Sequence, residues 1–305
     1  MPPQIITGYA DTPGGRDALA LGVALADATP GAELVVAAAY GYNPPVEAAP
    51  PQGWRKDLRD RADATLDSAR ALLDGRPGTS ITPCCGISPA DALHRLADEL
   101  HAEAIVVGVS HERGAGRILH GSVTEQTLHG AGTAVAVAPA GYADGPDRRI
   151  RTVVAAHNGS PESERALQAA ADLARAAGAG LKIVGVVEPN GAWYIAYLGP
   201  VAEQELHEHV RERLHAAGRR VGEGLAVQIH LASAADPARA IAEAADDADL
   251  LVLGSRGHGP LRRLLLGSVS SRLVREPPCP LLVLPRAAVE AVGRPPAEDG
   301  AGTGA

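Results

Sequence analysis

The same order of apolar run, glycine loop and helical segment occurs twice in this chain, and this duplication limits its fold more than any other feature. In the second copy, Gly254 follows the apolar run and Gly267 opens the helical segment. Gly108 and Gly121 take these places in the first copy, and each pair is 13 positions apart. The copies are offset by 146 residues. A chain of 305 residues therefore predicts two domains of similar build, each able to bury a core.

Apolar runs alternate with amphipathic segments along both halves. The runs are apolar at consecutive positions, which is typical of strands in a parallel sheet that helices cover on both faces. We therefore expect an α/β, Rossmann-like fold with two tandem, open, parallel five-stranded sheets flanked by helices. The expected strands are residues 4–9, 33–39, 80–85, 104–107, 134–138, 152–156, 181–187, 226–231, 250–253 and 280–284, and the expected helices are residues 16–28, 55–73, 89–100, a segment from 122, 162–177, 201–218, 237–245 and 268–275.

A segment rich in Gly, Asp, Pro and Arg separates the two halves and has the composition of a domain boundary. We expect a first domain at residues 1–140, a linker at 141–150 and a second domain at 151–286. The last residues, 287–305, consist mainly of Ala, Gly, Pro and acidic residues, which predicts a disordered tail.

The charge balance argues against two classes of partner. A net charge of −8 and a pI near 5.8 disfavour broad binding to nucleic acid or to an anionic membrane. No apolar run approaches the roughly 18 residues that span a bilayer, and the N-terminus does not resemble a signal peptide. The three cysteines have no pairing pattern, which favours a reducing compartment. We expect a cytoplasmic protein.

The second glycine loop has the residues that an anion site needs. Gly254 ends a buried strand, where a Cβ would block a ligand lying across the strand, and Gly257 lets the loop turn back. Gly267 and Ser268 lie where a helix leaves four N–H groups without acceptors, so these donors can bind phosphate oxygens. The structural alternative is that Gly254 only ends a strand and Ser268 only caps a helix, which is worth about 1 kcal/mol.

These residues resemble a known family motif. Universal stress proteins carry Gly, two residues, Gly, nine residues, then Gly followed by Ser or Thr, and Gly254, Gly257, Gly267 and Ser268 match it in full. Residues 4–285 thus resemble a tandem of two UspA-like domains. The resemblance implies a flavodoxin-like or adenine-nucleotide-hydrolase-like fold and a ligand that is ATP, with or without Mg²⁺, or another adenine nucleotide. It also implies a non-enzymatic sensor or regulator of the stress response.

The resemblance further implies that adenine and ribose lie between the ends of the first two strands of the second half. Asn158 takes the place of an Asp there, so it can still form hydrogen bonds but has lost the charge that would help to hold a metal. The residues expected to bind nucleotide in this half are Ala156, Asn158, Val186, Leu253, Gly254, Gly257, Gly267, Ser268, Val269 and Ser270.

The first half departs further from the motif. Ala10 stands where the Asp is expected, and Asp11 comes one position late. His111 replaces the middle glycine and would bring a ring into the space of the phosphates. We expect a weaker site here, and its residues are Asp11, Ala39, Gly108, Gly121, Ser122, Val123 and Thr124.

Two other functions stay open at this point. One is slow ATP hydrolysis assisted by His258 or by Mg²⁺, although the chain lacks the Gly-Lys-Ser/Thr loop and an evident group to position water, which favours binding over turnover. The other is an interaction module whose first half has lost nucleotide. No catalytic or metal-ligating residue is predicted.

The partners of the chain are only partly indicated. Occupancy of the second site would be reported through the loop 256–266 to a protein partner that the sequence does not identify. Single domains of this family pair through their last strands, so residues 135–138 and 281–284 are expected to meet in an intrachain pseudo-dimer. This contact would cover two apolar edges that otherwise invite aggregation. Further pairing of whole chains into a homodimer stays open.

Overall fold

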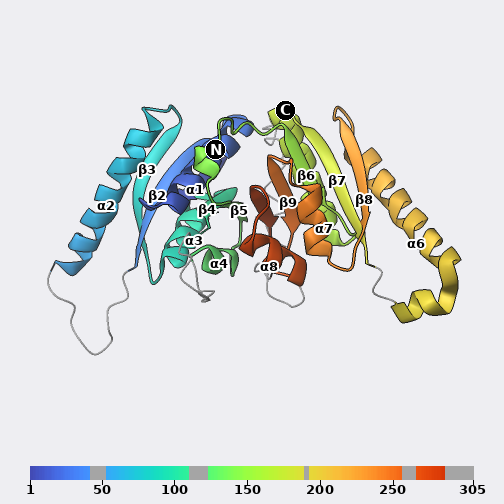
Figure 1. Cartoon of the computed structure of the whole chain (residues 1–305). Coiled ribbons are helices and arrows are strands. Elements are labelled where there is room, and N and C mark those ends of the chain that lie inside the picture. The colour runs from blue at the N-terminus through green and yellow to red at the C-terminus, as the bar shows by residue number, and fades with distance from the viewer. Residues whose placement is uncertain (42–52, 110–122, 189–191, 256–265, 286–305) are drawn as a thin grey trace, which may run out of the picture.

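A computed structural model describes residues 1–41, 53–109, 123–188, 192–255 and 266–285, and for residues 192–203 it describes the backbone alone. Helices cover both faces of one sheet (Figure 1). In chain order the elements are β1 (Gln4–Gly8), α1 (Pro13–Ala28), β2 (Glu33–Gly41), α2 (Trp54–Leu73), β3 (Thr79–Gly86), α3 (Pro89–Leu100), β4 (Ala104–Gly108), α4 (Val123–Leu128), β5 (Ala134–Ala138), the 3-10 turn η1 (Tyr142–Asp144), β6 (Thr152–Ala156), α5 (Pro161–Ala177), β7 (Gly180–Val187), α6 (Ala192–Val221), β8 (Val227–Ser233), α7 (Pro237–Ala244), β9 (Leu250–Gly254), α8 (Ser268–Arg275) and β10 (Leu281–Leu284).

The sheet has ten strands in the order β3-β2-β1-β4-β5-β10-β9-β6-β7-β8. Within each half the five strands are parallel and follow the order third, second, first, fourth, fifth. This confirms the predicted α/β class with an open parallel sheet. This is the order of the first five strands of a Rossmann sheet, whereas a flavodoxin-like sheet places its third strand between the first and the fourth. The flavodoxin-like alternative is therefore wrong.

The two predicted sheets are joined into one by their last strands. β5 and β10 pair antiparallel, with Val135 opposite Val283 and Val137 opposite Leu281. These four side chains are fully buried. The expected meeting of the last strands is thus confirmed, and this pairing joins the two five-stranded sheets and turns two apolar edges into the middle of a continuous sheet.

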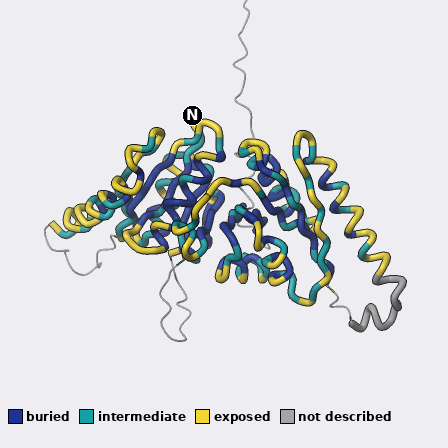
Figure 2. The backbone as a smooth tube through the Cα atoms, turned by 45° about the horizontal axis from the view of Figure 1, so that its top comes forward, coloured by how far each residue is buried: buried dark blue, intermediate teal, exposed yellow. Residues whose placement is uncertain are grey.

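A hydrophobic core lies on each face of the sheet and draws on both halves. On one face the core includes Leu66 of α2 and Leu214 of α6, and α1 and α5 complete the helical layer. On the other face the core includes Leu93 of α3 and Leu273 of α8, and α4 and α7 complete the helical layer. Figure 2 shows the buried strands between helices whose outer surfaces are exposed. Full burial of each such leucine is worth about 1.5–3 kcal/mol.

The segment predicted as a linker is fixed to the first half. Asp17 of α1 is 2% exposed, and its carboxylate accepts hydrogen bonds from the backbone N–H groups of Gly141 at 3.0 Å and Ala143 at 2.7 Å. Gly141 is the residue before the 3-10 turn η1, and Ala143 lies within it. A buried carboxylate needs such partners, so the connection between the halves is an ordered one. The domain boundaries themselves stay a prediction.

The largest difference in an element concerns α6. It begins at Ala192 rather than at residue 201 and extends well beyond the edge of the sheet (Figure 1). Pro200 lies inside this helix, although prolines are usually found in a first turn. No helix in the described ranges has an apolar stretch long enough to cross a bilayer.

Candidate functional site

The candidate site lies at the carboxyl ends of β6 and β9. β6 pairs with β7 on one side and with β9 on the other, so the connections after these strands leave in opposite directions. β1 has the same position between β2 and β4. In open α/β sheets, ligands bind in the crevice at such a reversal of strand order. Both halves therefore place their glycine loop at a typical ligand crevice.

Gly254 and Gly108 end β9 and β4 against the first turn of a helix. A Cβ on Gly254 would lie 2.6 Å from the carbonyl oxygen of Glu162, and a Cβ on Gly108 would lie 1.9 Å from that of Gly14. Both obstacles are backbone atoms, which cannot swing aside. The sequence interpretation assigned Gly254 to ligand space, but the packing of α5 by itself requires glycine here.

The N-terminus of α8 differs from those of the capped helices. In helices α1, α3, α5 and α7 a backbone N–H of the first turn donates a hydrogen bond to the side chain before the first residue, which is Thr12, Ser88, Ser160 or Asp236. α8 follows Gly267, which provides no side-chain cap and has extended backbone angles. The first N–H groups of a helix lack intrahelical acceptors, so those of Ser268, Val269 and Ser270 are suited to an anion.

Two of the predicted hydroxyl groups are used by the protein itself. The Ser270 hydroxyl donates to the carbonyl oxygen of Gly267 at 3.2 Å, and Ser270 is buried. Thr124, at the same place in the first half, donates to the carbonyl oxygen of Gly108 at 2.7 Å. Ser268, by contrast, is exposed. The backbone amide of Ser270 therefore stays a predicted contact, but its side chain does not.

Apolar residues line one face of the sheet beside the N-terminus of α8. Ala156, Val186 and Val269 are partly buried and pack on the core beneath α7 and α8. Leu253 is 4% exposed and belongs to the same core. In the first half, Ala39 is likewise partly buried and packs on the core of this face. The structure thus brings together the four apolar residues predicted for the second site, in a surface suited to a planar base.

The loop after β6 is held by its own side chains. Asn158 is exposed, and its Oδ1 accepts a hydrogen bond of 3.0 Å from the backbone N–H of Ser160. Ser160 in turn caps α5 by accepting from the N–H of Ser163. Since the turn engages the Asn158 oxygen, a ligand would meet the Nδ2 amide as a donor. An Asp would have offered a second acceptor oxygen instead.

The corresponding loop of the first half is arranged differently. Asp11 forms an exposed ion pair with Arg16 of α1, with 3.1 Å between Oδ1 and the guanidinium. Val123 is exposed at the start of α4. The remaining predicted residues Gly121, Ser122 and Gly257 lie outside the described residues, as do His111, His258 and the loop residues 256–265.

Sequence analysis missed Ser255, which directly follows Gly254. It is 1% exposed, and among the described residues its hydroxyl has no hydrogen-bond partner. An unsatisfied buried hydroxyl costs about 1–3 kcal/mol, so such groups often mark places where water or a ligand completes a site. The sequence does contain one indication, because the first half has the apolar Val109 at the position that Ser255 takes in the second half.

Sequence analysis also missed His157, the residue between β6 and Asn158. It is 2% exposed and lies on the face of the sheet that α5 and α6 cover, opposite the apolar surface beside α8. Its Nε2 is 3.1 Å from a carboxylate oxygen of Glu164. Burial lowers the pKa of His157 below its usual range, although the contact with Glu164 opposes this. The ring is therefore neutral at physiological pH.

Two of the three cysteines are buried. Burial raises the pKa of the Cys84 and Cys279 thiols to about 12, so neither is a thiolate at neutral pH. Among these residues no group of three or more His, Cys, Asp or Glu side chains could hold a metal ion.

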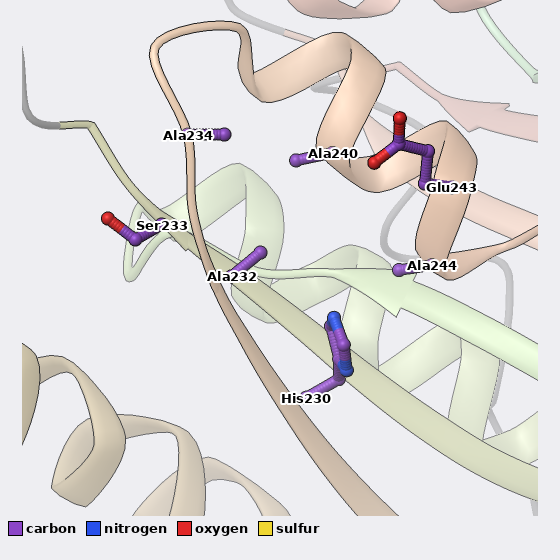
Figure 3. Close-up of a pocket in the computed structure, with 7 residues that line it drawn as sticks. All are labelled: His230, Ala232, Ser233, Ala234, Ala240, Glu243 and Ala244. Atoms are coloured by element: carbon purple, nitrogen blue, oxygen red, sulfur yellow. The ribbon is translucent and has the colours of Figure 1, made fainter.

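A separate hollow of about 260 Å³ lies between β8 and α7 (Figure 3). The internal repeat explains it, because Leu96 of α3 occupies the helix position that Ala244 holds in α7. The second half therefore has less side-chain volume at this position than the first. The lining residues are His230, Ala232, Ser233, Ala234, Ala240, Glu243 and Ala244.

Comparisons with known proteins agree with this geometry. Residues 1–139 and 149–285 match the universal stress protein family. A universal stress protein of Thermus aquaticus is 36% identical over 142 residues, which are 44% of this chain and 98% of the relative. One of Mycobacterium tuberculosis strain H37Rv is 32% identical over 203 residues, and the match spans 64% of this chain and 65% of that relative.

Among solved structures, a universal stress protein from Archaeoglobus fulgidus superimposes with a TM-score of 0.64 at 20% identity. The match covers 93% of this chain and 98% of that one. At this identity the likeness concerns the fold alone.

Proposed function

This chain belongs to the universal stress protein family, and on that premise we propose that its second half binds an adenine nucleotide, with ATP as the expected ligand. The single observation that carries the proposal is the N-terminus of α8, which follows Gly267 without a side-chain cap. We further propose that the protein acts in the cytoplasm as a non-enzymatic sensor or regulator of the stress response.

The surroundings of α8 support this ligand class. The N–H groups of Ser268, Val269 and Ser270 and the helix dipole favour phosphate, by about 0.3–1 kcal/mol for the dipole alone. The apolar surface of Ala156 and Val186 lies on the same face and suits a base. A phosphate group and a base are the two ends of one nucleotide, so the residues present fit the ligand.

Asn158 bears on the role of Mg²⁺. Its Oδ1 is engaged by the N–H of Ser160, which leaves an amide NH₂ group facing outward. Mg²⁺ prefers oxygen ligands. Any Mg²⁺ that accompanies ATP would then be held by phosphate oxygens rather than by this residue.

The first half is proposed as the weaker site. Asp11 pairs with Arg16, and the Thr124 hydroxyl binds the Gly108 carbonyl, so neither side chain is directed to a ligand. These two contacts also favour the alternative that this half serves as an interaction module. Hydrolysis is not proposed, because the sequence has no Gly-Lys-Ser/Thr loop to hold the phosphates for transfer.

Acid extraction of the purified full chain, followed by identification of the released compound, tests the ligand. Calorimetric titration with ATP should give one dominant site, and Gly267→Val should weaken binding there because a side chain then crowds the first turn of α8. The backbone angles of Gly267 are accessible to valine, so the variant is expected to fold. Unchanged ATP binding by this variant would overturn the proposal.

A further inference from the structure

The residue that follows the first strand holds the same place in both halves. The N–H of Tyr9 donates to the carbonyl oxygen of Ala37 at 2.8 Å, and the N–H of His157 donates to that of Val184 at 2.8 Å. Both side chains are buried, at 4% and 2% exposure. Each ring joins the loop after the first strand to the helical layer that covers this face.

The two halves satisfy these rings in different ways. The Tyr9 hydroxyl forms a hydrogen bond of 3.0 Å with the hydroxyl of Ser68 in α2, which is a neutral and complete pair. The His157 side chain is fully buried, and neither of its nitrogens makes a hydrogen bond of good geometry. The second half therefore has an imidazole without a good hydrogen bond where the first half has a phenol with one.

The charged groups around His157 come from α5 and α6. Glu164 of α5 approaches Nε2 at 3.1 Å, but it already accepts two hydrogen bonds of 2.6 Å from Arg220 of α6. Arg213 of α6 lies against Gly159, where a Cβ would come within 3.0–3.1 Å of its side chain. From β7, the Val184 carbonyl oxygen accepts the hydrogen bond from the backbone N–H of His157. The Glu164 carboxylate thus faces the ring and the Arg220 guanidinium, and the positive charge of Arg213 also acts on the ring.

We propose that His157 is a positioning residue for the nucleotide site of the second half, whose neutral ring holds the loop 157–160 against α6 and whose protonated ring releases it. A charged ring would have to take Glu164 from Arg220 or leave its buried place. Both responses move the residue that precedes Asn158. The proposal rests on the proposed nucleotide binding, but the effect on the loop can be measured without nucleotide.

The direction of the pH effect follows from the lowered pKa of His157 in the folded chain. The unfolded chain takes up the proton first, near the ordinary value of 6.5, so the stabilising contribution of the neutral ring is complete above that pH. It is lost as the pH falls through 6.5 towards the folded pKa. A single such proton weakens ATP binding at pH 5.5 by at most about tenfold.

Calorimetric titration of the full chain with ATP between pH 7.5 and 5.5 tests this. The wild type should bind ATP two- to tenfold more weakly at pH 5.5 than at pH 7.5. His157→Tyr, which copies the residue of the first half, should lose less of its ATP affinity over the same range. The ligand's own phosphate titrates at a pKa of about 6, but it does so for every variant, so the difference between variants isolates the ring. His215→Gln, at an exposed position of α6, is the matched control and should behave as the wild type.

Thermal unfolding of the ligand-free proteins over the same pH range separates the two proposals. The unfolding temperature of the wild type should decrease as the pH is lowered below 6.5, and that of His157→Tyr should decrease less. His157→Gln serves in its place where the tyrosine variant does not fold. Equal pH slopes for wild type and variants would overturn the role of His157, whereas different slopes without ATP binding would overturn only the proposed nucleotide.

Discussion

The guanidinium of Arg275 in α8 lies 3.7 Å from the carboxylate of Glu125 in α4. These two helices follow the glycine loops of opposite halves, so the pair connects the two halves across the junction of β5 and β10. Both side chains are partly exposed, and such pairs contribute about 0–1 kcal/mol. The stability of the junction must therefore come from the strands between the helices.

Leu281 tests that conclusion. It pairs with Val137 across the junction and is fully buried, so Leu281→Ala should lower the free energy of unfolding by about 2–5 kcal/mol. Leu282, the next residue, faces the other side and is only partly buried, and its alanine variant should cost less. Urea denaturation measures both. Equal losses would mean that burial at the junction does not set its stability.

Gly254 is expected to tolerate no side chain. Gly254→Ala places a Cβ 2.6 Å from the backbone oxygen of Glu162, and relief of this overlap should cost about 1–3 kcal/mol of stability. Gly132→Ala is the control, because a Cβ there meets nothing within 4 Å. It should be neutral or slightly stabilising. If thermal unfolding shows the two variants to be alike, helix packing is not the reason for this glycine.

Gly267→Asp separates folding from ligand binding. The new carboxylate can cap α8, so the stability should hold or rise by a few tenths of a kcal/mol. The same charge would repel a phosphate by about 1–4 kcal/mol, which weakens ATP about fivefold or more. Gly267→Asn caps without a charge and should weaken ATP less. Calorimetry and thermal unfolding test this pair, and an aspartate variant that binds ATP normally would contradict phosphate binding at α8.

Ser255→Val copies the residue that the first half has at this position. Removal of an unsatisfied buried hydroxyl should keep or raise stability by about 1 kcal/mol in the ligand-free chain. ATP affinity should fall if the hydroxyl completes the site. A variant with lowered stability and unchanged affinity would show that Ser255 serves the fold alone.

Much of the fold was predictable because the evidence for it is local. The consecutive apolar residues 250–253 and 281–284 indicate buried strands by themselves, and the glycine spacing reveals the repeat. The joining of the halves through β5 and β10 was expected only from the family resemblance, since no local pattern specifies which edges meet.

The misses in the site depend on residues far away in the sequence. His157 became notable only when α6 placed Arg220 on Glu164, which lies 56 positions earlier. Gly254 was assigned to a ligand because its neighbour, the first turn of α5, comes from a distant segment. The hydroxyl of Ser270 turns to its own helix, and a sequence pattern does not contain such a direction.

Ala244, the last residue of α7, and Ala245, which follows it, should respond oppositely to enlargement. Ala244 borders the hollow beside β8, and Leu96 fills the same helix position in the first half, so Ala244→Leu should raise the free energy of unfolding by about 0.5–2 kcal/mol. Ala245 is fully buried, and Ala245→Leu should lower it by about 1–3 kcal/mol because its core has no room. Thermal and urea unfolding compare the variants. A change of the same sign in both would mean that the hollow is not missing side-chain volume but a surface that solvent or a ligand already stabilises.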